Sequence, residues 1–162
     1  MSETPQQAYM QKCKKAAEKG NVIAQNTLAY LYLHGRGVEQ NDQQAAKWFR
    51  RAADQDYASA QYNLAVLYKL GQGVEKSAAE SIKWIQAAAN QNHAEAQSNI
   101  GNMFYQGLGI TQDYEMAYMW WSLAEKNGIQ NLTNNKNELS KKMNQTQISN
   151  AQQMITAWQV KH

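Results

Sequence analysis

The stretch Gly35-Arg36-Gly37-Val38 decides the fold, because it occurs three times. It returns as Gly-Gln-Gly-Val at 71–74 and as Gly-Leu-Gly-Ile at 107–110, so successive copies lie 36 residues apart. A single glycine pair after an apolar run would fit a phosphate-binding loop or any tight turn. Three pairs at one spacing, with no strand pattern before them, indicate helix-ending turns of a repeat rather than a nucleotide site.

Two further landmarks keep the same spacing. Ala-Gln pairs begin at 24, 60 and 96, and tryptophans stand at 48, 84 and 120. Apolar residues then fall on one helical face, which predicts a first helix (helix A) over 22–34 that ends at Gly35. A second helix (helix B) is predicted to begin behind an N-capping residue, at Asn41, Ser77 and Asp113. It is predicted to end where the residue type tolerates a left-handed backbone, near Asp56, Asn92 and Gly128.

This repeat predicts an all-α fold, a right-handed α/α superhelical solenoid of helix-turn-helix repeats in one domain over residues 1–162. Its expected parts are an N-terminal half repeat at 6–21, repeats at 22–57, 58–93 and 94–129, and C-terminal capping helices at 130–162. Cys13 takes the place of Phe49 in the half repeat and is expected to be buried. Asn144 and Gln147 are expected to form a capping box at the start of the last helix.

Composition and motifs argue against several classes of function. A single cysteine excludes an intramolecular disulfide, and no apolar run reaches the length of a membrane span. The net charge of +3 is spread along the chain, without a basic block or a base-reading pair in each repeat. No histidine and cysteine spacing predicts a metal site, and no nucleophile is paired with a base. We therefore expect no enzymatic activity, cofactor, metal, nucleic-acid binding or membrane insertion.

The second copy, ASAQYNLAVLYKLGQGVEKSAAESIKWIQAAANQNH at 58–93, resembles the Sel-one-like repeat family, which is related to tetratricopeptide repeats. The resemblance rests on Ala-x-Ala-Gln, Gly-x-Gly-Val, the tryptophan and Ala-Ala in this order, and it extends over residues 6–129. It implies an α/α solenoid that serves as a scaffold or adaptor and that takes part, in bacteria, in host contact or toxin immunity. It supplies no catalytic residues.

Several helix-A positions change freely between the three copies and lie opposite the core stripe at 100° per residue. Stacked repeats would align them along one concave wall, where exposed tyrosine and aliphatic side chains are typical anchors for a partner. The predicted partner-binding residues are Ile23, Asn26, Tyr30, Leu33, Tyr62, Val66, Lys69, Ser98, Asn102 and Tyr105. The expected ligand is a protein or peptide, and the chain is expected to be a monomer.

An adaptor that holds a partner on this face is the first functional hypothesis. The alternative is a toxin-neutralising immunity protein or a periplasmic envelope-assembly factor, followed by a small-ligand-binding or hydrolytic role. With Met1 as the native start, a cytoplasmic location is expected. A periplasmic or secreted location is expected if an export signal was removed.

Overall fold

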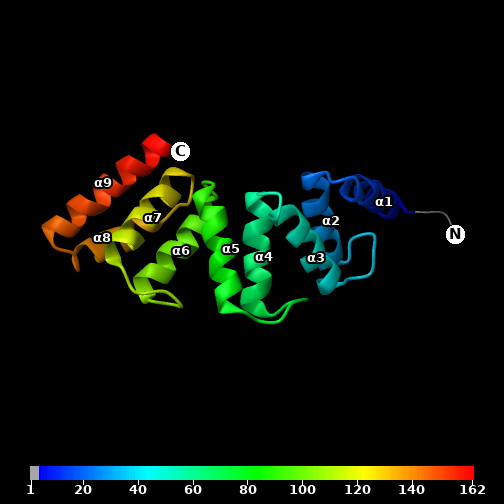
Figure 1. Ribbon diagram of the computed structural model, residues 1–162, viewed down its shortest axis with the longest axis horizontal. Coiled ribbons are helices and arrows are strands. Elements are labelled where there is room, and N and C mark those ends of the chain that lie inside the picture. Colours follow the sequence, from blue (N-terminus) through cyan, green and yellow to red (C-terminus); the bar gives the residue numbers. More distant parts are fainter. Residues whose placement is uncertain (1–3) are drawn as a thin grey trace. The chain divides into compact units, whose positions relative to one another are not determined.

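The structure, a computed structural model, describes residues 4–162 and contains nine helices and no strand in this range (Figure 1). Helix A of the three repeats is α2, α4 and α6, and helix B is α3, α5 and α7. The all-α solenoid predicted from the repeat is confirmed. None of the described helices combines the length and the hydrophobicity needed to cross a membrane. The helix bounds are α1 Pro5–Glu18, α2 Val22–His34, α3 Asp42–Ala53, α4 Ala58–Leu70, α5 Ala78–Asn90, α6 Ala94–Gln106, α7 Tyr114–Lys126, α8 Leu132–Ser140 and α9 Gln145–Lys161.

The chain divides into two compact units, of which unit 1 ends at Trp84 and unit 2 begins at Ile85. Unit 1 holds α1 to α4 and the first part of α5, and unit 2 holds the rest of α5 and α6 to α9. In unit 1, α2 packs against α1 and α3, and α3 also packs against α4. In unit 2, α7 packs against α6, α8 and α9. In each unit, therefore, a helix B contacts its own helix A and also the next element along the chain.

Local chemistry fixes where the repeat helices begin and end. Each helix A ends at the first glycine of a pair in the left-handed conformation, with φ of 64° at Gly35, 71° at Gly71 and 69° at Gly107. The predicted N-caps of helix B each accept a hydrogen bond from the backbone N–H three residues on, at 2.9 Å for Asn41, 3.2 Å for Ser77 and 3.0 Å for Asp113. The residues predicted to follow helix B all have positive φ, namely Asp56, Asn92 and Gly128.

In the first two pairs, the second glycine has a different role from the first. A Cβ atom added at Gly73 would lie 2.1 Å from the carbonyl oxygen of Asp42, in the first turn of the preceding helix B. At Gly37 the added atom would lie 2.5 Å from the carbonyl oxygen of Gln6 in α1. The loop after helix A therefore rests directly on the backbone of the preceding helix, and only a hydrogen atom fits between them.

A buried glutamine ties each helix A to the helix before it. Gln25 donates from its side-chain amide to the carbonyl oxygen of Ala17 at 3.1 Å, and Gln61 and Gln97 repeat this bond to Ala53 and Ala89 at 3.3 and 3.2 Å. The three glutamines are almost fully buried. The Oε1 atom of Gln25 also accepts a bond from Gln55, at 2.7 Å, beyond the end of the next helix B. This explains why the glutamine recurs. Its side-chain amide connects the start of its own helix with the end of the helix before it and the end of the helix after it.

Small residues let the two helices of one repeat approach closely. Ala29 and Ala45 are fully buried in the first repeat, and in the second repeat the Ser81 hydroxyl donates to the carbonyl oxygen of Ala65 at 2.9 Å. Cys13 is buried, as predicted from its repeat position. At the other end, Leu132, Leu139 and Met143 turn inward and share a core with Trp121 and Ala151. The predicted capping box of Asn144 and Gln147 is present at the start of α9.

Replacing Gly71 and Gly73 one at a time tests whether the second glycine is needed for the close approach of the two backbones. Gly71→Ala should cost about 1–2 kcal/mol, the penalty of a left-handed alanine, since the added methyl would lie 3.1 Å from the Cβ atom of Lys76 and would need only a small shift there. Gly73→Ala should cost about 1–3 kcal/mol more, because the added methyl meets the rigid backbone at Asp42. Urea denaturation checks this order. Equal losses for the two variants would contradict the proposed role of the second glycine.

Candidate interaction surface

In unit 1, α2 presents part of the predicted partner-binding face to solvent. Ile23 is 62% exposed and Tyr30 is 39% exposed, although both are large hydrophobic residues. Asn26 and Leu33 lie on the same face of the helix and are half-buried. On α4, Tyr62 and Val66 are half-buried and Lys69 is exposed. None of these seven side chains belongs to the buried core.

The ring of Tyr30 is held in place by its own repeat. It packs edge-to-face on Phe49 of α3, with ring centroids 5.2 Å apart, and it stacks on His34 one turn later at 6.1 Å. One side of a rigid aromatic ring is thus fixed while the rest is open to solvent. Beside it, the buried Oδ1 atom of Asn26 accepts no hydrogen bond from the described residues. A preorganised ring that is open to solvent on one side suits the recognition of a partner.

In unit 2, Asn102 has a role inside the fold. It occupies the repeat position of Tyr30 and accepts a hydrogen bond from Nε1 of Trp121 at 3.1 Å. A Cβ atom at the neighbouring Gly101 would lie 2.5 Å from the Trp121 ring, where the other repeats carry Ala29 and Ala65. Gly101 therefore makes room for the indole, and Asn102 satisfies its N–H. Comparison of the three copies did not predict this pairing. The available signal was that Gly101 and Trp121 both differ in size from the residues at the same positions of the other repeats.

Tyr105 also contacts residues of its own unit. Its ring lies 5.3 Å from that of Trp121 and 5.9 Å from that of Tyr114, and its hydroxyl accepts a hydrogen bond from Lys142 at 2.7 Å. Tyr105 and the C-terminal segment thus stabilise each other. Ser98, the remaining predicted residue of α6, is half-buried. The structure therefore brings Asn102 and Tyr105 together around Trp121, and the open aromatic surface of the helix-A positions lies on unit 1.

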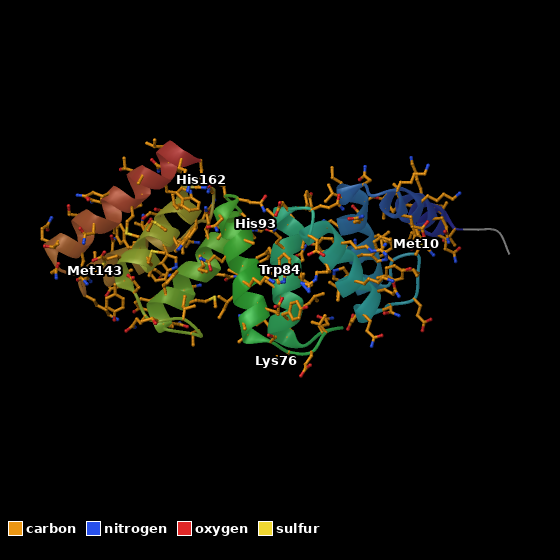
Figure 2. All side chains as sticks on the ribbon, viewed as in Figure 1. Met10, Lys76, Trp84, His93, Met143 and His162 are labelled. Carbon is orange, nitrogen blue, oxygen red and sulfur yellow. The ribbon has the colours of Figure 1, made fainter. Side chains whose placement is uncertain are left out.

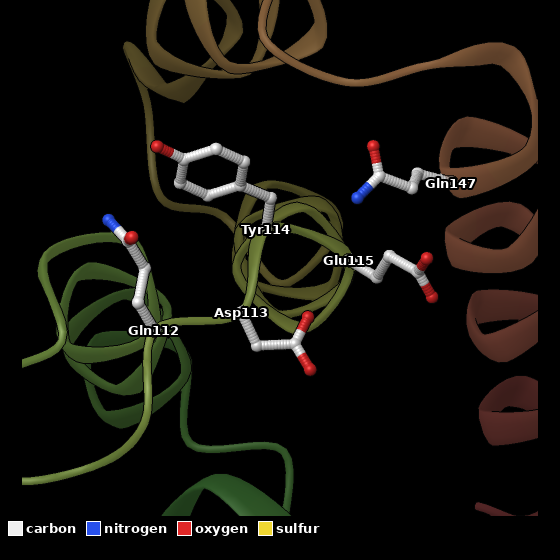
Figure 3. A pocket seen from close by; sticks show the side chains of 5 residues that line it. All are labelled: Gln112, Asp113, Tyr114, Glu115 and Gln147. Atoms are coloured by element: carbon white, nitrogen blue, oxygen red, sulfur yellow. The ribbon is translucent and has the colours of Figure 1, made fainter.

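A polar pocket of about 380 Å³ lies in unit 2, where α7 begins near the first turn of α9 (Figure 3). It is lined by Gln112, Asp113, Tyr114, Glu115 and Gln147. Its two carboxylates have structural partners. Asp113 caps α7, and Glu115 accepts a hydrogen bond at 3.3 Å from Asn150 of α9. Within residues 4–162, no three carboxylate, histidine or cysteine side chains gather as a metal site would need. The pocket walls therefore serve to join α7 to α9.

One histidine contributes to the start of a helix. His93 precedes α6 (Figure 2), and its Nδ1 atom accepts a hydrogen bond from the backbone N–H of Ala96 at 3.4 Å. Burial lowers the pKa of His93 below its ordinary value of 6.5, and the nearby Glu95 carboxylate opposes this shift in part. The neutral ring is the form that can accept the bond. Its protonation would place a positive charge at the positive end of the helix dipole.

These features define an α-helical repeat protein whose helix pairs are joined by buried glutamines and by glycine turns. The chain belongs to the Sel1 repeat family, because the family's Sel1 repeat model matches residues 22–57, 58–93 and 94–129. These limits coincide with the repeats predicted from the sequence. Sel1 repeats generally mediate protein–protein interactions.

Solved structures with the same kind of repeat resemble this fold. A Sel1 repeat protein from Oxalobacter formigenes shares 37% identity with a TM-score of 0.70, over 75% of this chain and 51% of that protein. The protective antigen c5321, present in uropathogenic Escherichia coli strains and displaying an SLR fold, shares 29% identity with a TM-score of 0.66, over 92% of this chain and 40% of the antigen. This chain thus spans about half or less of the length of these relatives. No curated protein matches it significantly.

Two asparagines at helix-A positions allow a matched test of the Trp121 contact. Asn102→Ala should cost about 1–3 kcal/mol, because it leaves the buried indole N–H of Trp121 without an acceptor. Asn26→Ala should change stability by less than about 0.5 kcal/mol, since its Oδ1 atom has no partner to lose. Chemical denaturation measures both. In a Trp121→Phe background, which has no indole N–H, Asn102→Ala should cost much less than in the wild-type chain. An equal cost in both backgrounds would refute the hydrogen-bond explanation.

His93 should make stability depend on pH in one defined window. Because its pKa is lower in the folded state, the unfolded chain binds more protons between that pKa and 6.5. The free energy of unfolding should therefore decrease as the pH falls through 6.5 and level off below the folded pKa. His93→Asn should remove this dependence and keep the cap, since Asn21 caps α2 at the equivalent position. Denaturation midpoints between about pH 5 and pH 8 test this, with His34→Asn as control.

Proposed function

We propose that this chain is a non-enzymatic adaptor that binds a protein or peptide on the helix-A face of unit 1, centred on Ile23 and Tyr30. The observation that carries the proposal is the exposure of these two side chains on one face of α2, at 62% and 39%. Each of them would bury more apolar area on binding, and aromatic residues anchored on one side are frequent hot spots of interfaces. The general role of Sel1 repeats in protein–protein interaction supports the same reading.

The equivalent faces of α2 and α4 extend this surface within unit 1. Both helices occupy the same place in successive repeats, so their corresponding positions face the same way when repeats stack. Tyr62, Val66 and Lys69 would then continue the surface that begins on α2. Asn102 and Tyr105 are not included, because their polar atoms already bond to Trp121 and Lys142. Ser98 is left out of the proposed surface as well.

The test compares two exposed aliphatic side chains. Ile23→Ser should weaken the binding of a partner captured by the wild-type chain, by up to about 30-fold if Ile23 is a hot spot worth about 2 kcal/mol. The matched control is Leu108→Ser, which removes another exposed aliphatic side chain, 54% exposed, from a loop of unit 2. Quantitative pull-down followed by calorimetry gives the affinities. If only Leu108→Ser weakens binding, the interaction surface is not on unit 1.

A further inference from the structure

The two helices of the proposed surface carry one formal charge, and it is positive. Neither α2 nor α4 contains an aspartate or a glutamate, and Lys69 is the only lysine or arginine in the two helices. Lys69 is exposed and forms no ion pair with the residues that the structure describes. The ion pairs of unit 1 lie on other helices. Arg50 pairs with Asp54 and Glu80, and Lys83 also pairs with Glu80. The lysine is therefore available to a partner.

The surroundings of the surface do not cancel this charge. The turns after the two helices each carry one basic and one acidic residue, Arg36 with Glu39 and Lys76 with Glu75. Across residues 4–84 there are eleven lysines and arginines against seven aspartates and glutamates, whereas residues 85–162 have five of each. Unit 1 thus has a positive field that attracts acidic chains at long range, and Lys69 supplies a local contact on the apolar face.

We propose that this surface binds a peptide segment that is both apolar and acidic. Its apolar side chains would lie against Ile23 and Tyr30, and a carboxylate would reach Lys69. This inference rests on the proposed function and adds the chemical class of the partner. A basic or neutral apolar segment would meet the same hydrophobic residues, but it would leave Lys69 without a counter-charge. A basic segment would also be repelled by the positive field of unit 1.

The experiment uses the full chain and a random peptide library as the probe. Peptides are selected on the wild-type chain and counter-selected on Ile23→Ser, so that the survivors need the proposed surface. We expect aspartate and glutamate to exceed lysine and arginine among the survivors. Their affinity should fall several-fold on Lys69→Gln, fall further on Lys69→Glu, and weaken as salt rises. Lys47→Glu makes the same charge change at an exposed position of α3 and should have a smaller effect.

The outcomes separate the two proposals. Survivors without an acidic excess, or with affinities that do not respond to Lys69→Gln, would overturn the acidic-partner inference and leave the proposed function standing. If no peptide survives the counter-selection on Ile23→Ser, the proposed function is contradicted together with the inference. Thermal unfolding of each variant verifies that it is folded, because a glutamate near the C-terminus of α4 meets the negative end of the helix dipole.

Discussion

The buried side-chain amide of Gln25, Gln61 and Gln97 is the interaction on which the repeat architecture depends. In each case it donates to a carbonyl oxygen at the end of the preceding helix, at 3.1 to 3.3 Å. A buried amide without partners would cost a few kcal/mol, so each glutamine is stable only when the preceding helix is in register. At Gln97 the amide oxygen also accepts a bond from Asn127, at 2.8 Å. One side chain thus couples the position of its helix to both neighbours.

Close backbone contact reinforces this coupling without side chains. The second glycine of a pair lets the loop after helix A touch the first turn of the preceding helix B, where Gly73 meets Asp42. This contact and the glutamine bond lie at opposite ends of helix A, because the Ala-Gln pair lies in its first turn and the glycines follow its last residue. Two contacts at opposite ends of a rod restrict its tilt as well as its position.

The helix-A positions opposite the core serve two purposes in this chain. In unit 2, Asn102 and Tyr105 contact Trp121, and the Tyr105 hydroxyl also accepts a hydrogen bond from Lys142 in the C-terminal segment. In unit 1, Ile23 and Tyr30 remain exposed, and Tyr30 contacts its own repeat through Phe49 and His34. The same repeat position therefore supports the fold in one unit and is open to a partner in the other. The partner surface we propose follows from this difference.

Residue types and their spacing were enough to predict the repeat, its period and the ends of its helices. Helix termini depend on local chemistry, so residues such as Gly35 and Asn41 could be assigned from residue type and spacing alone. The outward face of helix A also followed from periodicity, as Ile23 shows. Which residues of that face pack inside the fold depends on the three-dimensional arrangement of the helices. Asn102 and Tyr105 look variable along the chain, but their partners Trp121 and Lys142 lie 19 and 37 residues away. Such contacts depend on how helices pack in three dimensions, and no local pattern records them.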